Sequence, residues 1–299
     1  MAIYSISDLV KLSGIKAHTI RAWEQRYGII QPKRTTTNIR YYEDAELKQL
    51  LNIALLNKNG IKISKIAKMS EAERAEKIAD FSAVNYEYDT QLDALTISMI
   101  ELDEFKFNHI LETHIQQAGF EATMLRVIYP FLDKLSILWL TGSVNSVQES
   151  FISNLIRSKL IKATDELPIV NNQDEPGYLL FLPEDEQQEL SLLFMHYLLK
   201  ARNKRSLYLG QNISLTDIKD AEPIFRPTYL FTIISETFVR QPIEQYLSSL
   251  LNYFPNCQVM ATGYQVAVQH IPSHPRLIRL SSLQETLEQI DAPKPIDSV

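Results

Sequence analysis

The residues best suited to chemistry lie in two stretches, one in each half of the chain. Residues 19–42 read "TIRAWEQRYGIIQPKRTTTNIRYY", where basic and aromatic side chains stand close enough together to clamp a phosphate backbone. Residues 182–194 read "LPEDEQQELSLLF", directly after the apolar run "GYLLF". A loop between a buried strand and a helix is where α/β domains bind ligands. This loop, however, has neither a glycine for a phosphate nor a histidine for a metal.

The composition is that of an ordinary globular protein. The chain has 299 residues, of which 45% are apolar and 22% charged, and this length allows two or three domains. No apolar run approaches the roughly 20 residues of a membrane span, and the amino end lacks a signal-peptide layout. The single cysteine, Cys257, excludes an internal disulfide and a multi-cysteine zinc site. We therefore expect a cytoplasmic protein.

The net charge of −6 is unevenly distributed. Residues 1–80 carry 14 basic and 9 acidic side chains, whereas the rest of the chain carries 16 basic and 27 acidic ones. This asymmetry predicts a small module that faces a polyanion, carried on an acidic body.

The spacing of apolar residues predicts a winged helix-turn-helix domain over residues 1–81. Two helical patterns cover residues 4–27 and are separated by Ser13-Gly14, and Ser5 or Ser7 could cap the first. The following stretch with Pro32 predicts a hairpin or wing, and two or three more helices fill residues 43–81.

Two further domains are expected behind the first. Residues 90–166 repeat apolar side chains at intervals of three and four, which predicts a four-helix bundle between polar linkers at 82–90 and 165–177. In residues 177–292, five apolar strands alternate with amphipathic helices. This alternation predicts a Rossmann-like, flavodoxin-like parallel sheet covered on both faces. The fold class is therefore multidomain.

The second helix of a helix-turn-helix enters the major groove with its amino-terminal residues nearest the bases. Lys16 and His18 could donate to base edges or phosphates, and Thr19 and Arg21 could anchor phosphates. The wing adds Lys33, Arg34, Thr35, Asn38, Arg40, Tyr41 and Tyr42. The alternative is a small helical domain whose basic face is merely solvated.

Residues 4–78 resemble the DNA-binding domain of the MerR family of bacterial transcription regulators. The similarity rests on "TIRAWEQRYGIIQPKRTTTNIRYY" and on "GIKISKIAKMS". It implies that the second helix enters the major groove and that the wing grips phosphates. The contacts would then come from Thr19, Arg21, Arg34, Arg40 and Tyr42. It also implies that Trp23 and Gly28 are structural.

The rest of the chain resembles the cobalamin-dependent regulators of carotenoid and light-response genes. Their bundle carries Trp, nine residues, then Glu-His, and their Rossmann-like domain carries Glu-x-His-x-x-Gly, Ser-x-Leu and Gly-Gly. Here Trp139 and Glu149 keep the spacing, but Ser150 replaces the histidine. The other matching positions are Glu186, Gln188 and Ser191, then Thr232 to Ile234, then Thr262 and Gly263.

These departures predict that cobalamin ligation through a lower histidine has been lost. An imidazole ligates through a nitrogen lone pair. A glutamine amide nitrogen has no free lone pair, and its carbonyl oxygen is a weak donor. Ser191 and Thr262 add side chains where glycine would allow close approach. The acidic residues Glu184, Asp185 and Glu186 are expected to cap the next helix.

The remaining histidines and motifs give weaker evidence of function. His270 and His274 are four apart, but Pro272 between them argues against a helical metal site. His109 and His114, five apart, should point to different sides of a helix, and His196 should lie in the core or on the surface. There is no G-x-G-x-x-G, P-loop or nucleophile elbow.

We predict a non-enzymatic MerR-type regulator that binds promoter DNA as a homodimer and has no cofactor, with cobalamin disfavoured. Its effector could be another small molecule or a protein partner. Three alternatives remain: a working cobalamin photosensor, a corrinoid-carrier or methyltransferase-like enzyme, and a regulator that acts through protein contacts alone.

Overall fold

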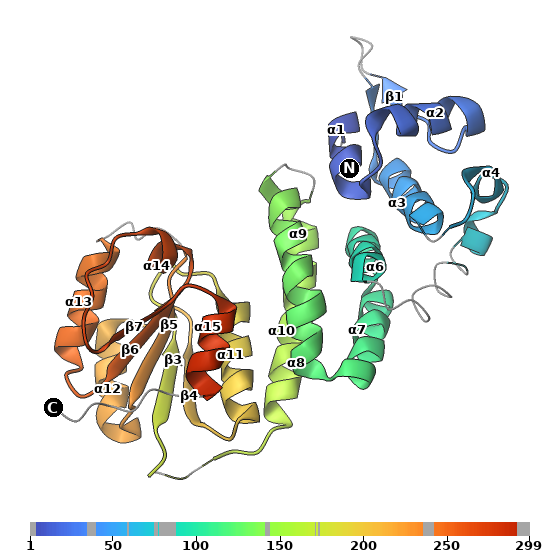
Figure 1. The fold of residues 1–299 in the computed structure, drawn as a ribbon. Helices are drawn as coiled ribbons and strands as arrows, with labels where there is room; N and C mark the ends of the chain where they lie inside the picture. Colours follow the sequence, from blue (N-terminus) through green and yellow to red (C-terminus); the bar gives the residue numbers. More distant parts are fainter. Residues whose placement is uncertain are drawn as a thin grey trace. The chain divides into compact units, whose positions relative to one another are not determined.

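The structure is a computed structural model that describes residues 4–34, 40–58, 60–74, 77, 88–140, 144–170, 172, 174–235 and 242–291. The chain forms two compact units, Met1–Leu155 and Ile156–Val299, and helix α10 (Ser146–Asp165) crosses the boundary between them. The units therefore do not coincide with the three domains expected from the sequence, and that division remains a prediction. Figure 1 shows the elements of both.

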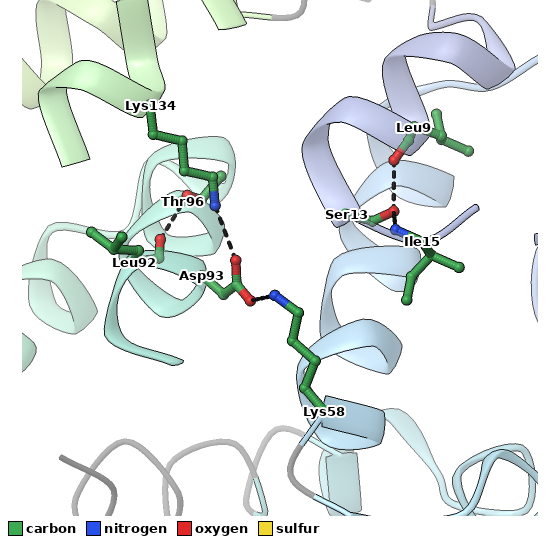
Figure 2. A network of polar contacts seen from close by, with 8 residues as sticks. All are labelled: Leu9, Ser13, Ile15, Lys58, Leu92, Asp93, Thr96 and Lys134. Carbon is green, nitrogen blue, oxygen red and sulfur yellow. Dashed lines mark hydrogen bonds and ion pairs between the residues drawn. The ribbon is translucent and has the colours of Figure 1, made fainter. Parts of the chain in front are cut away.

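The first unit begins with the expected helix-turn-helix. Helix α1 (Ile6–Ser13) starts at Ser5, whose side chain forms a reciprocal capping box with Asp8, and it ends at Gly14 in the left-handed region. The Ser13 hydroxyl donates to the Leu9 carbonyl (2.6 Å) and accepts from the Ile15 amide (3.2 Å), as Figure 2 shows. This side chain fixes the turn that leads into helix α2 (Ala17–Tyr27).

A small hairpin and two helices complete this part of the unit. Strands β1 (Lys33–Arg34) and β2 (Arg40–Tyr41) are antiparallel, as the expected wing requires. The main chains of Tyr4 and Tyr42 exchange two hydrogen bonds, which ties the start of the chain to the hairpin. Helix α3 (Asp44–Lys58) and the short helix α4 (Ile63–Ile66) follow.

The middle of the chain is helical, as expected. Helix α6 (Tyr88–Glu101) begins slightly before the expected start, and the remainder of the expected linker, residues 82–87, lies outside the described residues. Helix α7 (Glu104–Ala118) is followed by a continuous run of α8 (Phe120–Thr123), a π-helical turn (Met124–Ile128) and α9 (Tyr129–Leu140). Pro130 has no amide hydrogen to donate to the preceding turn, which accounts for the local widening.

The second unit is built on a five-stranded parallel sheet. The strands are β3 (Gly177–Phe181), β4 (Arg205–Gly210), β5 (Tyr229–Ile233), β6 (Gln258–Thr262) and β7 (Leu277–Leu280). Their order is β4-β3-β5-β6-β7, and every neighbouring pair is parallel. This is the flavodoxin-like order expected from the sequence, and its ligand edge lies at the carboxyl ends of β3 and β5.

Five helices connect and cover the strands: α11 (Glu189–Ala201), α12 (Leu215–Phe225), α13 (Ile243–Tyr253), α14 (Tyr264–Val268) and α15 (Leu283–Asp291). Helices α12 and α13 cover one face, and α11 and α15 cover the other (Figure 1). On the first face, Leu179, Leu230 and Val259 pack in one core with Leu247 and Leu250 of α13.

Candidate functional site

Helix α2 presents a basic surface from its amino-terminal half. Ile20 and Trp23 point into the core, and Gly28 ends the helix in the left-handed region. This anchoring leaves Lys16, His18 and Arg21 exposed and Thr19 half-buried. Lys16 is the N-cap residue and makes no side-chain capping bond. A lysine at the amino end of a helix adds its charge to the positive end of the helix dipole, an arrangement suited to an anion.

The β1–β2 hairpin contributes three more basic side chains. Lys33 and Arg34 of β1 are exposed, and Arg40 of β2 is half-buried. The Lys33 Nζ lies 2.5 Å from the Glu43 Oε2, and this hydrogen bond raises the pKa of Lys33. The Arg40 Nε lies 3.6 Å from the Glu24 Oε1 on α2. The Glu24–Arg40 pair thus joins the helix to the hairpin and partly neutralises Arg40.

Two of the wing residues named from the sequence, Thr35 and Asn38, lie outside the described residues. Tyr41 is half-buried. Tyr42 corrects the expectation of a phosphate contact, because its side chain is fully buried and its hydroxyl has no hydrogen-bond partner. Burial raises the pKa of Tyr42. Tyr42 follows β2 and forms an isolated bridge with Tyr4, and its buried ring belongs to the core, so it is left out of the proposed interface.

The bundle positions named by resemblance are only partly described. The side chain of Trp139 lies outside the described residues, although its backbone belongs to α9. Glu149 and Ser150 are exposed in the first turns of α10. A carboxylate at Glu149 suits the positive end of that helix.

At the ligand edge of the second unit, Gln188 occupies the position expected for a cobalt ligand. It is the N-cap residue of α11, is half-buried, and makes no side-chain capping bond. Ser191 is half-buried within the first turn of the same helix. The side chain of Gln188 therefore does not cap α11.

Glu186, in the loop before this helix, is only 4% exposed. Its Oε1 accepts from the amides of Gln187 (2.9 Å) and Gln188 (3.1 Å), and its Oε2 accepts from the amide of Ser235 (2.6 Å). One side chain thus joins the loop after β3 to the loop after β5. The sequence suggested capping for Glu186, but nothing in the spacing could reveal the bond to Ser235, 49 residues away.

The remaining positions named by resemblance lie at the ends of β5 and β6. Thr232 is fully buried, and its hydroxyl has no hydrogen-bond partner, while Ile234 packs in the core. The Thr262 hydroxyl donates to the Leu280 carbonyl of β7 (2.8 Å). Gly263 has φ +111°, and a Cβ there would lie 2.4 Å from the Ile234 carbonyl oxygen. Glycine is therefore required at Gly263 by the close approach of the two loops.

These residues do not fit a cobalamin held through a lower histidine. A glutamine stands at the ligand position, and both oxygens of Glu186 are engaged by main-chain amides rather than by an imidazole. Within the described ranges, no three His, Cys, Asp or Glu side chains gather into a group that could hold a metal ion.

The histidines of the second unit lie elsewhere. His196 is on α11, stacked on Tyr208 of β4 with the ring centroids 5.3 Å apart, and burial lowers its pKa to about 4. His270 and His274 are exposed in the loop before β7. In the first unit, His109 is exposed and His114 is buried, so the two do point to different sides of α7.

Comparison with known proteins matches residues 4–73 to the family described as MerR HTH family regulatory protein. The HTH-type transcriptional repressor CarH of Myxococcus xanthus is 26% identical over 276 residues, which cover 89% of this chain and 90% of that protein. The repressor CarA of the same organism is 24% identical over 248 residues, covering 82% and 80% of the two chains. Both relatives are named as transcriptional repressors, which agrees with the prediction of a regulator rather than an enzyme.

One solved structure shows a similar fold. The monomethylamine corrinoid protein of Methanosarcina barkeri aligns with a TM-score of 0.50 and 11% identity, over 68% of this chain and 97% of that one. The chain therefore has a MerR-type helix-turn-helix domain at its amino end and a cobalamin-binding-like domain at its carboxyl end. Among the described residues, no helix is both long and apolar enough to cross a membrane.

Proposed function

We propose that this chain, a homologue of the CarH and CarA repressors with a MerR-type helix-turn-helix domain, regulates transcription by sequence-specific binding to promoter DNA. The observation that carries the proposal is the exposed row of Lys16, His18 and Arg21 along the amino-terminal half of α2. The core contacts of Ile20 and Trp23 fix the direction in which this row faces.

In this proposal α2 enters the major groove and the β1–β2 hairpin lies along the flanking backbone. Lys16 and His18 are placed to reach base edges, whereas Arg21, Lys33 and Arg34 are placed to reach phosphates. Asn38, which lies outside the described residues, is kept in the proposed interface, and Arg40 must share its charge with Glu24. One such head contacts few base pairs, so we propose a homodimer on a pseudo-palindromic site.

We also propose that the C-terminal domain does not bind cobalamin through a lower histidine. Gln188 supplies no imidazole, and the Glu186 carboxylate is already bonded to the amides of Gln187 and Gln188, just before α11. Control of transcription would then come from another small molecule, a protein partner or concentration-dependent assembly in the cytoplasm.

A second candidate is a regulator that binds cobalamin without a lower histidine. The buried, unpartnered hydroxyl of Thr232 near the end of β5 favours it, since a polar group of a ligand could supply the missing hydrogen bond. Gel filtration of the full chain mixed with adenosylcobalamin separates the two candidates: corrin absorbance that elutes with the protein supports the second, and its absence supports the first.

The DNA-binding proposal is tested by selecting duplexes from a random pool with the full chain. We expect enrichment of one sequence with two related half-sites, bound with an affinity that falls steeply with salt. Failure to enrich any sequence at low ionic strength would contradict the proposal.

A further inference from the structure

Helix α3 is buried on all sides over one turn near its carboxyl end. Four consecutive residues, Ile53, Ala54, Leu55 and Leu56, are each at most 2% exposed. At 3.6 residues per turn, four successive side chains point in directions spread around the whole helix. A helix on the outside of a small DNA-binding head would instead keep one polar face. Two parts of the first unit meet at α3: the DNA-binding head, made of α1 to α4, and the helical region, made of α6 to α9. Helix α3 contacts α1 and α4 of the head and also α6 of the helical region. Helix α6 therefore completes the core of the head.

Two acidic residues of α6 strengthen this packing with ion pairs. Asp93 accepts hydrogen bonds from Lys58 of α3 (2.5 Å) and from Lys134 of α9 (2.9 Å). Figure 2 shows the carboxylate between these two lysines. Glu101 repeats the arrangement, since its oxygens lie 3.4 Å from Lys48 of α3 and 3.4 Å from Lys106 of α7. Each carboxylate thus pairs with one lysine of the head and one of the helical region.

The carboxylates lie in partly buried positions. The side chains of Asp93 and Glu101 are 13% and 14% exposed, whereas Lys58 and Lys48 are 41% and 42% exposed. An ion pair whose carboxylate is so little exposed to solvent is screened less by salt than an ion pair on the surface. Removing one carboxylate would leave two ammonium groups facing each other without the charge that joins them.

We call the contact of α3 with α6, together with the ion pairs of Asp93 and Glu101, the α3–α6 joint. A continuous series of helix contacts leads from this joint to α2, the helix proposed to bind DNA. Helix α3 packs on α1, and α1 packs on α2. The hydroxyl of Ser13 holds the turn between α1 and α2 by bonding to Leu9 and Ile15. A change in the position of α6 would therefore reach α2 through packed helices and a fixed turn rather than through a loose linker.

We propose that Asp93 and Glu101 lock the DNA-binding head onto α6, so that the helical region sets the pose and the DNA affinity of α2. This proposal rests on the DNA-binding function proposed above. Asp93 is the central residue, because it bonds to both lysines at hydrogen-bond distance.

The test uses the full chain with Asp93→Asn, which keeps the size of the side chain and removes its charge. We expect hydrogen exchange of the α3 and α6 amides to accelerate by roughly threefold to tenfold, with the amides of the second unit unchanged. We expect DNA affinity to fall by a similar factor while the slope of affinity against salt stays the same, because no phosphate contact is lost. Asp133→Asn, an exposed carboxylate on α9, is the matched control.

Lys58→Met supplies an independent variant, and the double variant closes a cycle with Asp93→Asn. The joint is supported if the double variant accelerates hydrogen exchange by less than the sum of the two single-variant effects. Wild-type exchange and wild-type DNA affinity in Asp93→Asn would overturn the proposal. If the unmodified chain bound no DNA, the DNA-binding function would fail, and the exchange measurement would still decide whether the joint exists.

Discussion

The carboxylate of Glu186 lies 2.6 Å from the main-chain nitrogen of Ser235, so a single buried side chain links the loops that follow β3 and β5. Those two loops form the edge where a flavodoxin-like sheet binds its ligand. The amides of Gln187 and Gln188, just before α11, are bonded to the protein's own carboxylate.

Replacing Glu186 with Gln should loosen this edge. The amide keeps one acceptor oxygen and turns donors toward main-chain N–H groups, which leaves buried groups unsatisfied at a cost of about 2 kcal/mol. Hydrogen exchange of the amides in 177–190 and 229–235 should therefore accelerate. Glu244→Gln, an exposed carboxylate on α13, should change nothing. Equal protection in both variants would show that the Glu186 bonds do not hold the loops.

Arg21→Ala should weaken DNA binding in a way that depends on salt. Arg21 is exposed on α2, and if its guanidinium neutralises one phosphate, its loss reduces the slope of log K against log salt by about 0.9. Fluorescence anisotropy titrations at several salt concentrations measure this slope. Lys162→Ala removes an exposed cation from α10 and should leave the slope unaltered. A slope that is the same in Arg21→Ala and the unmodified chain would place Arg21 outside the interface.

The stability of the second unit should fall in mild acid because of His196. Burial lowers the pKa of His196 to about 4, whereas an unfolded histidine titrates near its ordinary value of 6.5. The unfolded chain therefore binds a proton first as the pH falls, and stability is lost between about 6.5 and about 4. The loss is on the order of 3 kcal/mol.

His196→Phe keeps the stacking on Tyr208 and removes the titrating group. Urea unfolding followed by far-ultraviolet circular dichroism at several pH values should then show a shallower acid dependence for this variant. The same dependence in both proteins would assign the effect to other groups.

The fold could be predicted from the sequence because its signals are local. Ser5 and Gly14 bound α1, and runs such as "YLLFL" mark strands buried on both faces. The expectation that Gln188 stands where a histidine would ligate cobalt rests on residue type alone and stays a prediction.

The contacts that define the sites could not be predicted, because they join residues far apart in the sequence. Glu186 reaches Ser235, and Asp93 reaches both Lys58 and Lys134, through tertiary packing alone. Tyr42 was misplaced for a related reason. Basic and aromatic residues alternate in the wing, but only the paired hairpin and its bond to Tyr4 show that this ring turns inward.

The most direct measurement is a titration of the full chain against a duplex selected from a random pool, in the dark, with and without adenosylcobalamin. The account predicts tight binding at low ionic strength, a steep loss of affinity with salt, and the same curve in both samples. Absence of binding at low ionic strength, or binding that requires the corrinoid, would contradict it.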